Sequence, residues 1–181
     1  MMGTSDEKKP HYTHFGGCDP AYGAGKYASE SAFVYLGRDS VVPRMVDRFK
    51  PSEGQTHWGR LLRTRAWADK VGAFACDDSG GHLLIAFLTV PLVRKNPSVF
   101  RGLTEARTAI GLGLSIRCRA LEDTHDATIK SHYKLPKAWG GKKNKHTLLV
   151  SKAREFWPEC PQSDDIAVAY LAALMVREKN L

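Results

Sequence analysis

A continuous apolar run extends from His82 to Val90, between Gly81 and Pro91. An uninterrupted apolar run between a glycine and a proline is typical of a β-strand that is buried on both faces. Such a strand lies in the interior of a sheet that is covered by helices on both sides. The run therefore predicts an α/β fold in which this segment is a central strand.

The segments around this run alternate between strand patterns and helix patterns. Short apolar or alternating stretches predict strands, and apolar residues at helical spacing predict helices. The expected strands are residues 12–18, 26–37, 41–49, 82–90 and 115–121, and the expected helices are 58–76, 98–114 (with Ser98 as the N-cap), 125–133, 145–157 and a final helix from about 164. Three strands in a row followed by helix–strand alternation predict a mixed five-stranded sheet with helices on both faces.

The length of 181 residues and the 43% hydrophobic content suit one domain with a single core. We expect that domain to cover residues 11–181 and the polar residues 1–10 to be flexible. The four cysteines are scattered, which favours buried thiols over a zinc site or disulfides. No signal peptide or membrane-spanning run is visible, so we expect an intracellular protein that does not enter a membrane.

The chain is basic, with a formal net charge of +8. This charge favours an anionic partner, of which nucleic acid is the first candidate and an acidic membrane surface the second. No acid occurs between Ala127 and Arg154, and this stretch contains the cluster Lys142, Lys143 and Lys145. We expect the cluster to contact phosphate groups, and the alternative is an ordinary solvated basic loop.

Two adjacent acids, Asp164 and Asp165, precede a run that stays uncharged until Arg177. The run predicts a helix that is buried on most of its faces. Acids in the first turn of a helix have an ordinary role as caps of its free N–H groups. A single residue suffices for that role, however, and two carboxylates can also bind a divalent metal ion.

A third acid, Asp19, ends the first predicted strand and is followed by Pro20 and several glycines. Asp-Pro followed by glycine is ordinary turn chemistry, so this segment alone does not identify a site. The first strand is usually central in a sheet of this kind. If the final helix packs on that sheet, Asp165 comes to the same edge as Asp19.

These motifs together resemble the RuvC-like Holliday junction resolvase branch of the RNase H-like nuclease superfamily. The matching segments follow the order of the family through nearly the whole chain. They are Gly17-Cys18-Asp19-Pro20-Ala21 with Gly25-Lys26-Tyr27-Ala28, then 94–98 with 103–107, 128–130, 140–150 and 164–169. The resemblance implies an RNase H-like α/β fold and, for symmetric junctions, a homodimer.

In that family, four carboxylates hold two divalent metal ions that hydrolyse a phosphodiester bond. The resemblance implies that Asp19 and Asp165 are metal ligands and that Mg²⁺ or Mn²⁺ is the cofactor. The companion acid of the final helix would fall near Gln162, where Asp164 is the only substitute. The resemblance also implies that Lys130 and Lys145 contact DNA phosphates.

The chain departs from the family at the end of the fourth strand, because the expected glutamate falls near Thr89 and no acid is present there. Another acid could complete the site, or the site has decayed while the fold is kept for binding. The nearest acids in sequence are Glu105, Glu122, Asp123 and Asp126.

The function that the resemblance implies is that of a metal-dependent, structure-selective endodeoxyribonuclease that cleaves branched DNA such as Holliday junctions. The alternative is a catalytically degenerate RNase H-fold protein that binds nucleic acid, for example as a component of a ribonucleoprotein complex. A third possibility is another metal nuclease or a transposase-like domain on the same fold.

Overall fold

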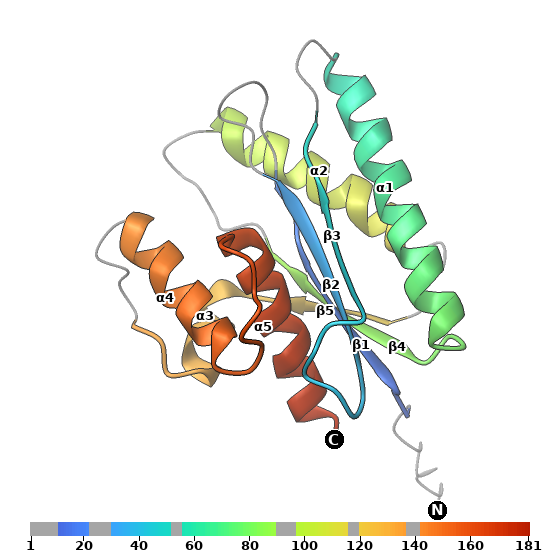
Figure 1. Ribbon diagram of the computed structural model, residues 1–181. Coiled ribbons are helices and arrows are strands. Elements are labelled where there is room, and N and C mark those ends of the chain that lie inside the picture. The colour runs from blue at the N-terminus through green and yellow to red at the C-terminus, as the bar shows by residue number, and fades with distance from the viewer. Residues whose placement is uncertain (1–10, 22–29, 52–55, 90–96, 116–119, 137–141) are drawn as a thin grey trace, which may run out of the picture.

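The computed structural model describes residues 11–21, 30–51, 56–89, 97–115, 120–136 and 142–181. In this part of the chain, five strands form one mixed sheet (Figure 1). In spatial order they are β3 (Met45–Phe49), β2 (Ser31–Gly37), β1 (His14–Asp19), β4 (Leu83–Leu88) and β5 (Ala120–Thr124). β1 is antiparallel to β2 and parallel to β4, so the predicted mixed sheet with a central first strand is confirmed.

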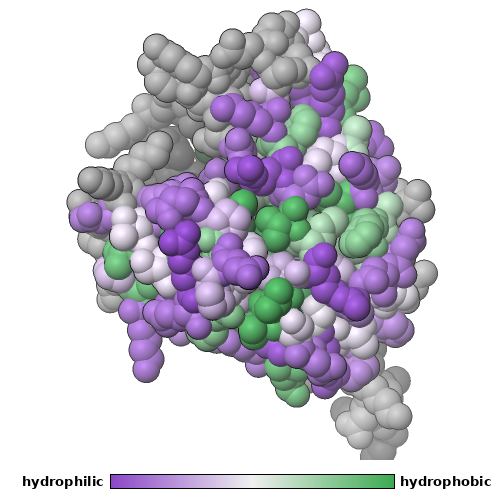
Figure 2. All heavy atoms as spheres, in the orientation of Figure 1, coloured by the Kyte–Doolittle hydropathy of each residue, from purple (hydrophilic) through white to green (hydrophobic). Residues whose placement is uncertain are grey.

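Helices cover both faces of the sheet, as Figure 1 shows. One face carries α1 (His57–Asp78) and α2 (Pro97–Ser115), and the other carries α3 (Asp126–His132), α4 (Lys142–Arg154) and α5 (Asp164–Lys179). Successive side chains of a strand point to opposite faces, so each central strand contributes to two cores. All six residues of β4 are buried, as the apolar run in the sequence predicts. The surface in the same view is largely hydrophilic, with a few apolar patches near its middle (Figure 2).

The last helix, α5, crosses β1 at Gly17 in very close contact. A Cβ atom added to Gly17 would lie 1.8 Å from the carbonyl oxygen of Ala169 and 2.8 Å from the backbone nitrogen of Ala173. Only a residue without a side chain permits this approach. The α5 residues 166–176 are all buried, which confirms the prediction from the long uncharged run.

The direction of α5 relative to β1 follows from a contact near its other end. Arg177 donates a hydrogen bond from Nε to the carbonyl oxygen of Arg38, which follows the last residue of β2. That end of β2 pairs with His14, the first residue of β1. The C-terminus of α5 therefore lies at the start of β1, and its N-terminus lies toward the end of β1.

The positions of two strands differ from the sequence prediction. The strand predicted for residues 115–121 is wrong in position, because α2 continues to Ser115 and β5 begins at Ala120. The prediction followed apolar residues, whereas this edge strand carries two acids. β3 begins at Met45 because Pro43 has no N–H to donate, and pairing starts with a hydrogen bond of 2.8 Å from Arg44 N to Tyr35 O. The first part of the strand predicted for 26–37 lies outside the described residues.

Two helix boundaries also differ. α2 begins at Pro97, so Ser98 lies inside the helix and is not its N-cap. α4 covers Lys142–Arg154 instead of residues 145–157. Its earlier end fits the restriction that Pro158 places on the residue before it. None of the helices in the described part of the chain combines the length and apolar composition of a membrane span.

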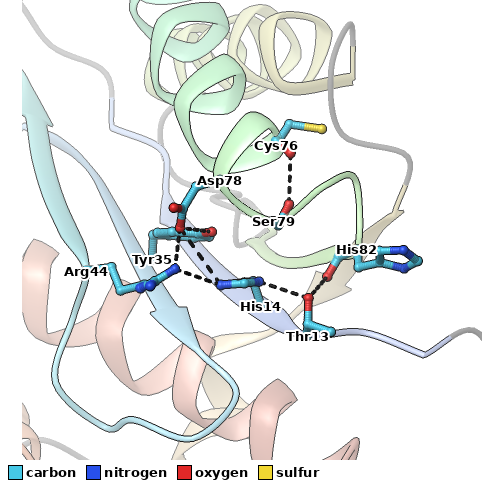
Figure 3. Close-up of polar contacts among 8 residues, drawn as sticks. All are labelled: Thr13, His14, Tyr35, Arg44, Cys76, Asp78, Ser79 and His82. Carbon is cyan, nitrogen blue, oxygen red and sulfur yellow. Dashed lines mark hydrogen bonds and ion pairs between the residues drawn. The ribbon is translucent and has the colours of Figure 1, made fainter.

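A polar cluster ties the start of β1 to the end of α1 (Figure 3). The Tyr35 hydroxyl donates to a carboxylate oxygen of Asp78 at 2.8 Å, and Arg44 forms an ion pair with the same oxygen. The ring of His14 stacks on Tyr35, and its Nε2 lies 3.0 Å from Nη1 of Arg44. Because an arginine can only donate, His14 accepts this hydrogen bond as a neutral ring. The cluster lies at the opposite end of β1 from Asp19.

This geometry predicts a loss of stability in mild acid. Burial, and then the neighbouring Arg44, lower the pKa of His14 below its ordinary value of 6.5. The unfolded chain therefore binds a proton more readily than the folded protein, and stability falls as the pH drops below 6.5 toward the lowered pKa. We expect a His14→Gln variant to show a flatter pH dependence of the free energy of unfolding in this window. Urea unfolding at several pH values measures this dependence, and a His82→Gln variant, which changes an exposed histidine, is the control. If the free energy of unfolding changed equally with pH in the wild type and in His14→Gln, His14 would not cause the loss of stability.

Candidate functional site

Asp19 is the last residue of β1 and lies on the face that α5 covers. Phe15 belongs to the core under α5, and Gly17 touches the backbone of that helix. Since residues i, i+2 and i+4 of a strand share a face, Asp19 lies on this face too. Its half-buried carboxylate is therefore at the edge of the sheet where α5 begins.

Asp165 reaches the same edge from the first turn of α5. It precedes Ala169 by four residues, so it shares the helix face that crosses β1 at Gly17. The N-terminus of α5 lies toward the end of β1, where Asp19 is the last residue. Two acids from distant parts of the sequence thus lie at one edge of the sheet. Their role as metal ligands stays a prediction.

Asp164 faces a different neighbour, the helix α4. Its Oδ1 atom lies 3.6 Å from Nδ1 of His146, and the amide nitrogen of Gln162 lies 3.2 Å from Nε2 of the same ring. The His146 ring therefore lies between Asp164 and Gln162, with one ring nitrogen toward each. Asp164 therefore contacts α4, whereas Asp165 lies on the helix face that crosses β1. Sequence reasoning missed His146, which follows the lysine cluster directly.

The N-cap of α5 is Ser163. Its hydroxyl oxygen accepts a hydrogen bond of 3.4 Å from the backbone nitrogen of Ile166. The explanation of Asp164 and Asp165 as capping residues is therefore not needed. Both acids remain in the first turn, where the helix dipole favours negative charge.

The neighbouring strand β4 places a leucine beside Asp19. Cys18 and Phe87 are the last pair of this parallel ladder, and the same register continued by one residue places Leu88 next to Asp19. Leu88 belongs to the core under α5 and is only 7% exposed, so it flanks Asp19 on the same face. Leu88 thus occupies the position on β4 where a carboxylate could join Asp19. It is apolar, and it is the residue before Thr89.

A polar contact joins the residues that directly follow β4 and β5. The Thr89 hydroxyl lies 2.6 Å from Nδ1 of His125, and the Thr89 backbone nitrogen donates to the carbonyl oxygen of Thr124 at 2.8 Å. The side chain of Thr124 is buried, and its hydroxyl has no hydrogen-bond partner among the described residues. The signal that could have found the Thr89–His125 contact is their common place directly after two consecutive parallel strands.

Asp123, one of the acids that the sequence offered as a further ligand, faces away from Asp19. It pairs in register with Phe87, which belongs to the core under α1 and α2. Arg107 of α2 forms an ion pair with Asp123 and donates from Nε to the carbonyl oxygen of Leu88 at 3.2 Å. Its guanidinium also lies over the Phe87 ring, 4.6 Å from the ring centre. Arg107 therefore fixes the ends of β4 and β5 from the face opposite to α5.

The other three acids that the sequence offered as further ligands are Glu105, Asp126 and Glu122, and they lie in three different parts of the fold. Glu105 pairs with His57 of α1 at 2.9 Å, on the face opposite to α5. Asp126 pairs with Lys130 within α3, also at 2.9 Å. Glu122 lies in the edge strand β5 and pairs with Ala86, which belongs to the core under α5. Glu122 and Asp19 are therefore on the same face of the sheet.

The described residues contain no group of three or more His, Cys, Asp or Glu side chains that could hold a metal ion. Two carboxylates nevertheless suit one Mg²⁺ ion, which usually binds one or two carboxylates and completes its shell with water and substrate phosphate. That Asp19 and Asp165 hold such an ion stays a prediction. The apolar Leu88 beside Asp19 does not fit the two-ion site with four carboxylates that the resemblance implies.

Of the four lysines expected to contact nucleic acid, Lys130 has a described side chain. It is half-buried and lines a hollow of about 370 Å³ on α3, together with Ser131 and the exposed Lys134. Lys142, Lys143 and Lys145 lie in the first turns of α4, and their side chains are outside the described part of the chain.

The central strand β1 pairs antiparallel with β2 on one side and parallel with β4 on the other, and helices cover both faces. This arrangement defines an RNase H-like α/β fold. More specifically, the fold is RuvC-like. A structure of RuvC from Thermus thermophilus in complex with a Holliday junction substrate matches with a TM-score of 0.67 and 12% sequence identity, over 93% of this chain and 98% of that chain. Another structure of Thermus thermophilus RuvC matches with a TM-score of 0.64 and 14% identity, over 89% and 91%. Comparison with protein-family models and with curated proteins gave no match.

Proposed function

We propose that this chain is a divalent-metal-dependent endonuclease that cleaves branched DNA such as a Holliday junction. Asp19 and Asp165 are the proposed ligands of one Mg²⁺ or Mn²⁺ ion, and Asp164 is the third acid at this edge. A bound ion would stabilise the negative charge that develops on the phosphate oxygens during hydrolysis. Lys130, Lys142, Lys143 and Lys145 are the proposed contacts to backbone phosphates, which position the DNA without reading its sequence.

The observation that carries this proposal is the crossing of α5 over β1 at Gly17. The crossing is close enough to require a glycine, and it brings Asp19 and Asp165 to one edge from opposite ends of the chain. A protein of the same fold has been solved with a Holliday junction, which supports the choice of substrate. The net charge of +8 supports a nucleic-acid partner, whether DNA or RNA.

The test is incubation of the protein with a labelled four-way junction and Mg²⁺ or Mn²⁺. We expect paired nicks that fall about a hundredfold or more in an Asp19→Asn variant, because a ligand of the ion is lost while the fold is kept. Asp39→Asn is the matched control, since it makes the same change in an exposed acid near the other end of β1. Equal cleavage by the wild type and Asp19→Asn would contradict the proposed site.

The second candidate is a protein that binds branched or structured nucleic acid without cleaving it. The apolar Leu88 beside Asp19 favours this candidate, because it stands where a further carboxylate ligand is needed. In the same assay, a junction that is bound but stays intact with either metal supports this candidate and contradicts the first.

Three further expectations from the sequence stay predictions. They are a single domain over residues 11–181, a homodimer and an intracellular setting.

A further inference from the structure

Trp58 is the most exposed large hydrophobic residue in the described part of the chain, with a relative exposure of 73%. It lies in the first turn of α1 and lines a groove of about 290 Å³ between α1 and α2. Its ring meets the ring of His57 edge to face, with 5.7 Å between the ring centres. Tryptophan is buried to a large extent in most proteins, so an exposed one beside a groove indicates a binding surface.

The helix α1 brings Trp58 to the end of the molecule where Asp19 lies. Nine residues further along α1, Trp67 stacks on Phe49 with 5.8 Å between the ring centres. Phe49 is the last residue of β3, at the end of the sheet where β2 pairs with Asp19. Trp58 lies about 14 Å further out along the helix axis. α1 and α5 thus begin at the same end of the sheet, as Figure 1 shows.

The surroundings of Trp58 carry mainly positive charge. The first nine residues of α1 contain no acid and three arginines, Arg60, Arg63 and Arg65. Glu105 lines the groove, but its carboxylate is already paired with His57 at 2.9 Å and with Arg101 at 2.8 Å. The N-terminal end of a helix dipole adds to the positive potential. These charges favour a nucleic acid over an apolar segment of a protein.

The groove beside Trp58 has an apolar floor and hydroxyl groups on its α2 side. Leu61, Leu62 and Leu112 supply apolar surface. Thr104 and Thr108 also line the groove, and each hydroxyl donates to the carbonyl oxygen four residues earlier at 2.9 Å. The hydroxyl oxygens keep lone pairs that can accept from an amino group. A flat aromatic face, an apolar floor and polar acceptors at the side suit the flat ring and polar edge of a nucleobase.

We propose that Trp58 is a stacking platform for an unpaired base of a bound nucleic acid and that the groove holds this base. Stacking on an aromatic side chain binds any base, because every base has a flat face. The arginines near Trp58 supply contacts to the phosphates beside the base. Unpaired bases occur in single strands and at branch points, whereas the bases of a complete duplex are stacked on one another.

This inference rests on the proposed nucleic-acid partner, but it does not rest on cleavage. Binding is therefore measured in EDTA, which removes divalent metal ions. A wild type that binds no nucleic acid would contradict both the proposed function and the stacking site. A wild type that binds a junction and leaves it intact with either metal would contradict only the nuclease.

Fluorescence anisotropy of a labelled single-stranded DNA and of a complete duplex of the same length measures both affinities. We expect Trp58→Leu to weaken binding of the single strand about tenfold or more and to leave binding of the duplex unchanged, because leucine is apolar but has no ring. Trp58→Phe keeps a ring and is expected to retain most of the affinity. The salt dependence is expected to be the same in Trp58→Leu and the wild type, since stacking releases no counterions.

Phe74→Leu is the matched control, since Phe74 is an aromatic residue of α1 that is 52% exposed and does not line the groove. We expect this variant to bind both probes as the wild type does. Thermal unfolding and sedimentation velocity verify that each variant is folded and keeps the oligomeric state of the wild type. Equal affinities of Trp58→Leu and Trp58→Phe for the single strand, an equal loss for the duplex, or a loss that accompanies a changed oligomeric state would overturn the proposal.

Discussion

Replacement of Gly17 by alanine is expected to destabilise the protein by about 3 kcal/mol, at the upper end of the usual cost of overpacking a core. The added Cβ would lie 1.8 Å from the carbonyl oxygen of Ala169 and 2.8 Å from the nitrogen of Ala173. Both atoms belong to the backbone of α5, so no side-chain rotation relieves the clash, and the helix must move away from β1. Urea unfolding followed by circular dichroism measures the loss.

Gly16→Ala is the matched control for this prediction. A Cβ atom on Gly16 would meet Cγ1 of Ile85 at 3.0 Å and ring atoms of Phe33 at 3.4 Å. These are side-chain atoms that can shift by a few tenths of an ångström. Both substitutions reduce the freedom of the unfolded chain equally, so their difference isolates the contact with α5. Equal losses in the two variants would show that α5 does not cross β1 at Gly17.

Gly17→Ala also bears on the candidate site. Asp165 lies one helical turn before Ala169, so a displacement of α5 at Gly17 moves Asp165 relative to Asp19. If the chain is a nuclease, we expect the remaining folded Gly17→Ala protein to lose cleavage activity as well. Gly16→Ala is expected to keep it.

Much of the fold could be predicted from the sequence because its strongest signals are local. The apolar run of β4 and the uncharged run of α5 each describe an element whose burial is complete, and periodicity detects such elements well. The edge strand β5 was placed too early because it is half-exposed and contains Glu122 and Asp123. Its position depends on pairing with β4, which is a long-range contact.

The candidate site could be predicted in part, for a related reason. Asp19 and Asp165 stand at the ends of well-marked elements, and a central first strand under the last helix brings such ends together. The register between β1 and β4 could not be predicted, since a shift of one residue exchanges the faces of a strand. That register decides that Leu88, and not Thr89, flanks Asp19. The contact of Asp164 with His146 depends on how α4 packs against α5, which no local pattern encodes.

Introduction of a carboxylate at Leu88 is expected to create a metal site beside Asp19. In a Leu88→Glu variant, burial and the charge of Asp19 would both raise the pKa of the new carboxyl group, and the metal-free protein would be less stable than the wild type. A divalent ion that binds both carboxylates would reverse this loss. At a metal concentration of about one hundred times Kd, binding adds about 2.7 kcal/mol to the free energy of unfolding.

Thermal unfolding with Mg²⁺, Mn²⁺ or EDTA measures this gain, and Leu88→Gln is the matched control, with a side chain of the same length and no charge. We expect the metal-dependent rise in Tm to be larger for Leu88→Glu than for Leu88→Gln and to vanish when Asp19→Asn is added. Equal rises in Leu88→Glu and Leu88→Gln would show that residue 88 does not flank Asp19.

The same variant separates a nuclease from a binding protein of the same fold. If the wild type binds a four-way junction without cleaving it and Leu88→Glu cleaves it with Mg²⁺ or Mn²⁺, then the missing carboxylate on β4 is what prevents catalysis. If the wild type already cleaves, catalysis does not require a carboxylate at residue 88, and Leu88→Glu is expected to change the metal concentration that cleavage requires. Because Leu88 is a core residue next to the one acid of β1, a single substitution tests both the register of the sheet and the chemistry at its edge.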